Sequence, residues 1–172
     1  MNAEATLVEQ YHAEHHAAEA SRREFLTCRL GEETYGIDIL QVQEIREIDR
    51  VTRVPHVAAF VRGVINLRGA IVPVVDLGLM FGFPEPLPLA KASTIVLNVD
   101  QRLVGLVVAS VSDVVALADD EIRPAPELGD RAIGVAIAGI GVRRDADGKD
   151  DVNSILLMDV DHVMRRIRTE RE

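Results

Sequence analysis

Short apolar runs separated by turn residues fill the chain from Phe25 onward. In FLTCRL and TYGID, apolar and polar residues alternate with the two-residue period of a strand that has one buried face. Similar runs follow as GVINL, AIVPVVDL, STIVLNV, RLVGLVVASVSDVVAL and SILLMDV. Many short strands punctuated by glycine and proline indicate an all-β protein, built as a sandwich or as barrels.

Helix is predicted in few places. Single turns are expected at AAFVRG and LGLMFG, and a longer helix at DHVMRRIRTE near the end of the chain. Residues 1–24 have no glycine or proline and are rich in alanine, glutamate and histidine, which favours helix. Their apolar stripe is thin, so a frayed helix or a mobile tail is predicted there.

The alternation changes phase near Leu40. Apolar residues occupy odd positions up to Ile39 and then even positions at Leu40 and Val42. Because a shift of one residue turns a strand over, this pattern predicts a bulge or a sharp bend.

Val42 and Glu44 share one face of the strand that follows this shift. If Ile45 packs inward, both would stand on the surface, and an exposed valine beside a carboxylate would suit a docking surface. The simpler alternative is that Val42 belongs to the core and Glu44 is merely solvated.

Arg68 lies between two apolar runs, in GVINLRGAIVPVVDL. Arg68 and Gly69 are predicted to form the turn, with Asn66 on the same face as Arg68. Pro73 lacks an N–H group, so its strand is expected at a sheet edge or at a bulge. Arg68 could then lie at a barrel rim with Glu44 as its ionic partner; the alternative is a solvated hairpin arginine.

The chain also carries an internal repeat. Sliding the sequence by 69 residues brings Gly36 onto Gly105, Val42 onto Val111 and Glu44 onto Asp113. Farther on, with some drift, Gly63 matches Gly139 and Asp76 matches Asp159. Two copies of one β unit predict two small barrels packed face to face.

Composition narrows the possible functions. A chain of 172 residues can bury about 70% of its unfolded surface, so it needs no stabilising metal or disulfide. A net charge of −9 and six aromatic residues argue against binding nucleic acid. A single cysteine, no apolar run long enough to span a membrane and no signal-like start lead us to expect a cytoplasmic protein.

Candidate catalytic and metal-binding residues are few. No phosphate-binding loop or nucleophile elbow is present. Cys28 could be a nucleophile, but it lies in a predicted strand, where a buried thiol is the simpler interpretation. His12, His15 and His16 form one metal-like cluster without an evident fourth ligand, and DADGKDD has its glycine in the wrong place for a calcium loop. We therefore expect no enzyme activity, no cofactor and no functional metal site.

From Phe25 to about Met164 the chain resembles the CheW family of bacterial chemotaxis coupling (adaptor) proteins. The resemblance lies in YGIDILQVQEIR, FVRGVINLRGAIVPVVDL, LVGLVVASVSDV and IRPAPE, in the family's order and spacing. It implies two five-stranded SH3-like β-barrels packed around a shared hydrophobic core. The expected division is an extension over 1–24, helical or disordered, a CheW-like domain of two intertwined barrel subdomains over 25–164, and a basic helix end over 165–172.

The resemblance also implies a function. It predicts an adaptor that joins the cytoplasmic tip of methyl-accepting chemoreceptors to the regulatory domain of the histidine kinase CheA, beneath membrane receptor arrays. The family positions implicated in these contacts match Val42, Glu44, Gly63, Arg68, Ser93 and Gly105. A CheW-like scaffold serving surface sensing or biofilm control is the alternative, because the extension, the charged loop over 143–153 and the short basic C-terminal helix depart from the family pattern.

Overall fold

The computed structural model describes residues 6–8, 22–125, 136–142 and 154–169. Three features singled out in the sequence lie outside these residues: the histidine cluster at His12, His15 and His16, the charged loop over 143–153, and most of the N-terminal extension.

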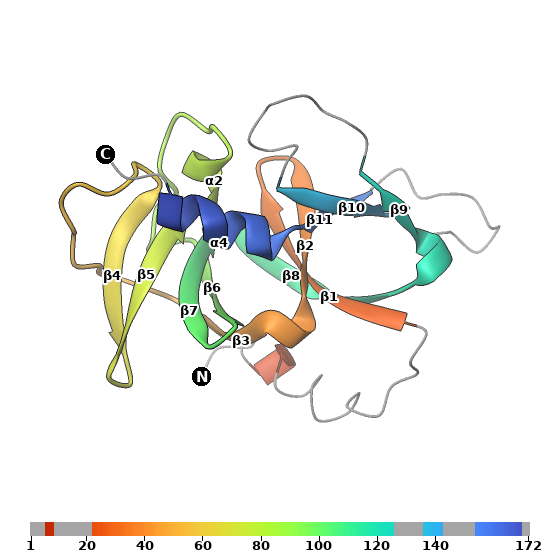
Figure 1. The fold of residues 1–172 in the computed structure, drawn as a ribbon, viewed down its shortest axis with the longest axis horizontal. Coiled ribbons are helices and arrows are strands. Elements are labelled where there is room, and N and C mark those ends of the chain that lie inside the picture. The colour runs from red at the N-terminus through yellow and green to blue at the C-terminus, as the bar shows by residue number, and fades with distance from the viewer. Residues whose placement is uncertain (1–5, 9–21, 126–135, 143–153, 170–172) are drawn as a thin grey trace.

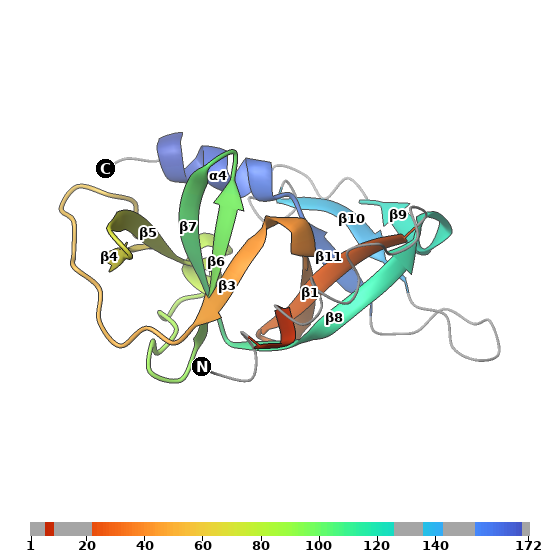
Figure 2. The same ribbon diagram turned by 90° about the horizontal axis from the view of Figure 1, so that it is seen from below.

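The chain forms two antiparallel-rich β-sheets that lie side by side along its long axis (Figures 1 and 2). The five-stranded sheet has the order β3-β6-β7-β5-β4. Its strands are β3 (Val42–Arg46), β4 (Val61–Leu67), β5 (Ala70–Asp76), β6 (Ser93–Val99) and β7 (Arg102–Val108).

The six-stranded sheet has the order β8-β1-β2-β11-β10-β9. Its strands are β1 (Arg22–Leu30), β2 (Glu33–Asp38), β8 (Ser110–Ala118), β9 (Ile122–Pro124), β10 (Ile137–Gly141) and β11 (Ile155–Met158). Short helical segments link the strands: η1 (Ile39–Gln41), α2 (Leu77–Met80), η2 (Asp119–Glu121) and α4 (Val160–Thr169). The helices predicted at LGLMFG and DHVMRRIRTE are thus present as α2 and α4.

Strand pairing agrees with the internal repeat. In the repeat, the first five strands of the chain, β1 through β5, correspond in order to β6, β7, β8, β10 and β11. Replacing each strand of the five-stranded sheet by its counterpart gives the order β8-β1-β2-β11-β10, which is the order found in the six-stranded sheet. The sixth strand, β9, pairs with β10 just as the isolated bridge at Thr52 pairs with Val64 of β4. Each sheet therefore takes strands from both repeats, joined by the parallel pairs β2–β11 and β5–β7.

A hydrophobic core lies between the two sheets. Leu26 and Ile37 of the six-stranded sheet pack in the same cluster as Ile95 and Leu106 of the five-stranded sheet, and all four are fully buried. Smaller apolar clusters lie within the sheets, one in the six-stranded sheet and two in the five-stranded sheet. This all-β arrangement with few short helices confirms the predicted fold class.

Part of the N-terminal segment contributes to the shared core. Residues 6–8 are helical, and Val8 is buried in the cluster between the sheets. The state predicted for the rest of the extension, helical or mobile, stays a prediction.

Two local predictions need adjustment. Ala58 accepts a backbone hydrogen bond from Val61 at 2.9 Å, which closes one turn at AAFVRG, but the chain continues from Val61 as β4 rather than as helix. Pro73 was expected at a sheet edge or at a bulge. The edge position is wrong, because β5 lies between β7 and β4. Parallel pairing with β7 covers only Val74 to Asp76, so the imino nitrogen of Pro73 lies just before the ladder begins.

Candidate functional site

The turn between β4 and β5 presents Arg68. Arg68 and Gly69 both have positive φ angles, 51° and 90°, as the two central residues of a tight hairpin turn require. The side-chain oxygen of Asn66 accepts a hydrogen bond from the Gly69 N–H at 2.9 Å. Asn66 therefore holds the turn, a role that its polarity within an apolar run could have indicated.

Arg68 and Glu44 form the predicted ion pair. The Arg68 Nη2 atom donates to Glu44 Oε2 at 2.8 Å, and the side chains are 66% and 21% exposed respectively. Glu44 is on β3 and Arg68 lies in the turn just after β4, and β3 and β4 are the two edge strands of the five-stranded sheet. The pair thus bridges the open side of the curled sheet and forms its rim.

The second oxygen of this carboxylate is shielded. Glu44 Oε1 is buried and has no hydrogen-bond partner among the described residues; it forms an ion pair with Arg46 Nη1 at 3.6 Å, which is too long for a hydrogen bond. Because a buried acceptor without a donor is costly, this oxygen is a position where a donor from a partner would be favourable.

Val42 is buried, at 3% exposure, so the interpretation of Val42 as an exposed docking residue is wrong. Pairing between β3 and β6 shifts register between Val42 and Glu44, which marks a bulge. The bulge lets Val42 and Ile45 both face the core, although they are three residues apart. The predicted bend just before β3 is present as η1, and it leaves Leu40 83% exposed.

Three of the six predicted site residues share one row across the five-stranded sheet. Glu44 pairs with Val96, Val96 with Gly105, Gly105 with Val74, and Val74 with Gly63. Directly paired residues point to the same face, so the rim carboxylate and the two glycines lie on one face of the sheet.

Close contacts restrict both positions, and most strictly Gly63. A Cβ atom on Gly63, whose φ is +146°, would overlap the carbonyl oxygen of Thr52. A Cβ atom on Gly105 would lie 3.0 Å from Thr94 Cγ2. These residues shape the sheet beneath the rim and carry no side chain that could reach a partner.

Ser93 lies apart from this row. It is buried at the start of β6 and pairs with Val108, three residues before Val96. The structure therefore brings Glu44 and Arg68 into contact, aligns Gly63 and Gly105 with them, and places Val42 and Ser93 in the interior.

One apolar residue near the rim was missed from the sequence. Ile71 is 65% exposed on β5, where it pairs with Asn66 beside the turn. The alternation along β5 contained the signal, because the next residue, Val72, is fully buried and adjacent strand residues face opposite ways.

The geometry of Cys28 does not favour a nucleophile. The thiol is fully buried, and burial raises the pKa of Cys28 to about 12, so the reactive thiolate is scarce at neutral pH. Among the residues that the structure describes, no group of three or more His, Cys, Asp or Glu side chains could hold a metal ion. No helix in the same residues is long and apolar enough to cross a membrane.

Comparison with known proteins agrees with this architecture. The family model for the CheW-like domain matches residues 24–168. The chemotaxis protein CheW of Klebsiella aerogenes is 47% identical over 125 residues, covering 73% of this chain and 75% of that protein. A probable chemotaxis protein CheW of Rhizobium etli is 40% identical over 106 residues, or 62% of this chain and 68% of that protein.

A solved structure shows the same fold. The crystal structure of the scaffolding protein TtCheW from Thermoanaerobacter tengcongensis superposes with a TM-score of 0.69 at 28% identity, covering 80% of this chain and 88% of that one. With its repeated β units, its rim pair and these relatives, the chain belongs to the CheW family of chemotaxis adaptor proteins.

Proposed function

We propose that this chain joins the cytoplasmic tips of methyl-accepting chemoreceptors to the regulatory domain of the histidine kinase CheA, and that the receptor binds at the Glu44–Arg68 rim. The observation that carries the proposal is the geometry of this pair. It combines an exposed guanidinium, held by one ionic bond, with a shielded carboxylate oxygen that has no donor.

Recognition explains the rim better than stability does. An ion pair as exposed as this one contributes about 0–1 kcal/mol to folding. Glu44 fixes the direction of the Arg68 guanidinium, whose remaining N–H groups can donate to carbonyl or carboxylate oxygens of a partner. The shielded Glu44 Oε1 can accept a hydrogen bond in return.

Apolar surface beside the rim fits the same role. Ile71 is mostly exposed next to the turn that carries Arg68. A small apolar area next to oriented polar groups is the usual composition of a protein-binding surface. In this proposal Val42, Gly63, Ser93 and Gly105 support the surface from within the sheet.

The protein in this proposal acts by contact and not by catalysis. It works in the cytoplasm beneath receptor arrays and needs no cofactor. The relatives named above are chemotaxis proteins, which favours chemotaxis over a surface-sensing or biofilm pathway.

The proposal is tested by co-sedimentation of the chain with receptor-bearing membranes and CheA. Arg68→Ala should weaken receptor binding at least tenfold, leave CheA binding intact and change the free energy of unfolding by less than about 1 kcal/mol. Arg102→Ala is the matched control, because Arg102 is also exposed on the five-stranded sheet and forms no ion pair among the described residues. A large fall in melting temperature with normal receptor binding would contradict the proposal.

A charge-reversed pair separates recognition from closure of the sheet. The double variant Glu44→Arg, Arg68→Glu can re-form the ion pair with its polarity reversed. If a partner recognises the two charges, this variant stays as weak as Arg68→Ala. Full recovery of receptor binding would show that the pair only holds the sheet closed.

A further inference from the structure

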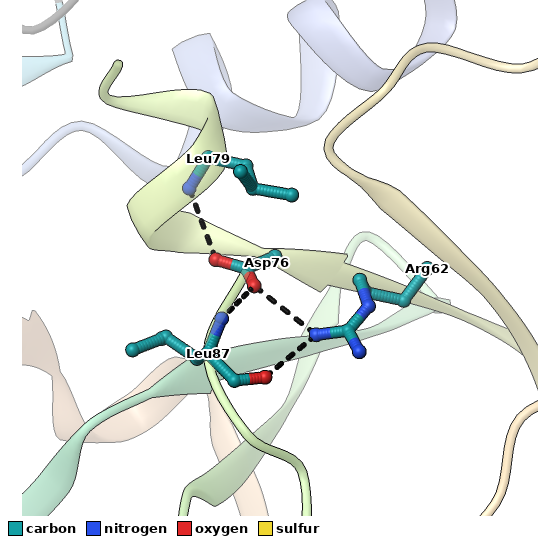
Figure 3. A network of polar contacts seen from close by, with 4 residues as sticks. All are labelled: Arg62, Asp76, Leu79 and Leu87. Carbon is teal, nitrogen blue, oxygen red and sulfur yellow. Dashed lines mark hydrogen bonds and ion pairs between the residues drawn. The ribbon is translucent and has the colours of Figure 1, made fainter. Parts of the chain in front are cut away.

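Asp76 is a fully buried carboxylate at the end of β5, and its contacts go beyond those of a helix cap (Figure 3). Its Oδ1 atom accepts a hydrogen bond from the Leu79 N–H at 3.0 Å, which caps α2. Its Oδ2 atom accepts from the Leu87 N–H at 2.8 Å and faces Arg62 Nη1 at 3.2 Å. The same Arg62 nitrogen donates to the Leu87 carbonyl oxygen at 2.8 Å.

The described residues of the second repeat do not form this arrangement. Asp159, the counterpart of Asp76, caps α4 by accepting from the His162 N–H at 3.0 Å. If Gly63 corresponds to Gly139, the residue that corresponds to Arg62 is Ala138, which is exposed. Capping is therefore common to both repeats, whereas the ion pair and the hydrogen bonds to the Leu87 backbone are found only in the first repeat among the described residues.

The segment held by Asp76 reaches from the five-stranded sheet to the six-stranded sheet. Phe81 packs on Tyr35 of β2, with 5.4 Å between the ring centroids. The Phe83 ring lies over Gly31 in the β1–β2 turn, 3.1 Å from where a Cβ atom on that glycine would be. Two aromatic rings anchored from one sheet thus press on the first hairpin of the other.

A contact from α4 reinforces this bridge. Arg166 donates to the Met80 carbonyl oxygen at 3.0 Å, and its guanidinium lies 5.3 Å from the centroid of the Phe60 ring. Because α4 directly follows β11 of the six-stranded sheet, the bridge is attached to that sheet at a second point.

We propose that the Asp76–Arg62 pair positions the two sheets relative to each other, and that receptor control of the kinase depends on this fixed geometry. The inference rests on the proposed function, since an adaptor that binds two partners transmits a displacement only if its parts move as one body. Asp76 and Arg62 are positioning residues, because they act through the 77–87 segment and touch no partner.

Distance measurements on the chain alone test the structural half of the proposal. Nitroxide labels at Arg102→Cys on β7 and Ala116→Cys on β8 report the separation of the sheets, and both positions are exposed. The native Cys28 is fully buried and stays unlabelled. We expect Asp76→Asn and Arg62→Gln to broaden the distance distribution at least twofold, while Asp159→Asn, which keeps an oxygen to cap α4 and loses only the charge, leaves it unchanged. An unchanged distribution in a folded Arg62→Gln variant would overturn the proposal.

Kinase assays test the functional half. In Arg62→Gln, affinities for a receptor fragment and for the CheA regulatory domain should stay within twofold of the unsubstituted chain, while receptor control of kinase activity falls at least tenfold. Arg62 is partly exposed, so this variant remains informative even if Asp76→Asn fails to fold. If receptor control of kinase activity fell only in proportion to the loss of receptor or CheA affinity, a positioning role would be refuted. If the unsubstituted chain bound no receptor, the proposed function would fail, whereas the distance measurement would still decide whether the pair holds the sheets.

Discussion

At Gly63 the backbone leaves no room for a side chain. Its φ angle is +146°, a conformation that other residues rarely adopt, and the Thr52 carbonyl oxygen occupies the place of a Cβ atom. The Thr52–Val64 bridge brings that carbonyl close, with backbone hydrogen bonds of 2.8 and 2.9 Å. Glycine is therefore needed at position 63 so that the Thr52 segment can pack against β4, whether or not a partner binds nearby.

Gly63→Ala should lower the free energy of unfolding by more than about 2 kcal/mol, because backbone strain adds to an overlap with main-chain atoms. Gly69→Ala is the control, since Gly69 also has a positive φ but has nothing within 4 Å of its Cβ position, and it should cost about 1 kcal/mol. Urea denaturation of both variants measures the difference. Equal losses would show that the Thr52 contact is unimportant.

Burial of two ionisable side chains predicts instability at alkaline pH. Burial raises the pKa of the Cys28 thiol from 9.0 to about 12, and mainly burial, with Glu33 second, raises the pKa of Tyr35 from 10.0 to about 12. Above about pH 9 the unfolded chain releases these protons while the folded chain retains them. The free energy of unfolding should therefore fall as pH rises from about 9 towards about 12, by up to about 1.4 kcal/mol per pH unit for each group.

Denaturation curves between about pH 8 and pH 11 measure this slope, and Cys28→Ala should make it shallower. Slow alkylation of Cys28 in the folded chain, accelerated by denaturant, is the companion observation. Rapid alkylation of the native protein would contradict the buried thiol and revive the nucleophile hypothesis.

Part of the rim can be predicted from the sequence. The Arg68-Gly69 hairpin turn is recognisable, and Glu44 is the expected partner of Arg68. A neighbouring strand does not bring the two together, however, because β3 and β4 are the opposite edge strands of the sheet. The Asp76–Arg62 pair could not be predicted in the same way. Its third member is the backbone of Leu87, and nothing in the local pattern around Leu87 indicates where that backbone lies.

At the scale of elements, the bulge in β3 decides which side chains the sheet exposes. Simple alternation places Val42 and Glu44 together on the surface, but the register shift between them turns Val42 into the core. The sequence showed the change of phase near Leu40 and correctly predicted a bend there. It did not show the bulge between Val42 and Glu44, because a bulge is a mismatch in the pairing of two strands, here β3 and β6, and cannot be seen in β3 alone.

Val42→Glu should therefore destabilise the fold by about 3 kcal/mol or more, since it buries a charge without a partner. Leu40→Glu, two positions away, should change stability by less than about 0.5 kcal/mol because Leu40 is exposed. Thermal and chemical denaturation of the two variants makes the comparison. Normal stability of Val42→Glu with lost receptor binding would restore the interpretation of Val42 as a surface contact.

For the whole molecule, the exchange of strands between repeats means that neither half contains a complete sheet. The five-stranded sheet takes β3, β4 and β5 from the first half and β6 and β7 from the second. The duplication itself could be recognised from Gly36 and Gly105 and the other matched positions. The exchange could not be recognised from these residues, because they do not reveal which copy of a strand pairs with which. Only the family resemblance implied intertwined subdomains.

Fragments comprising residues 1–88 and 89–172 should each lack stable tertiary structure and should form a native-like complex when mixed. Each fragment alone lacks one partner of both parallel pairs, β2–β11 and β5–β7, and therefore exposes unpaired strand edges. Circular dichroism and amide-proton NMR spectra of the separate and mixed fragments measure this. A well-dispersed spectrum from either fragment alone would contradict the interdependence of the halves.

This interlocking has a consequence for origin. A half-length ancestor with one copy of the unit could complete its sheets only by exchanging strands with a second, identical chain, as in a domain-swapped homodimer. Fusion of the two genes would have joined the two chains of that symmetric dimer permanently. After fusion, one copy could accumulate substitutions while the other kept the original contacts. The two copies now differ in this way, because Arg62 faces Asp76 in the first copy while Ala138 occupies the matching place in the second.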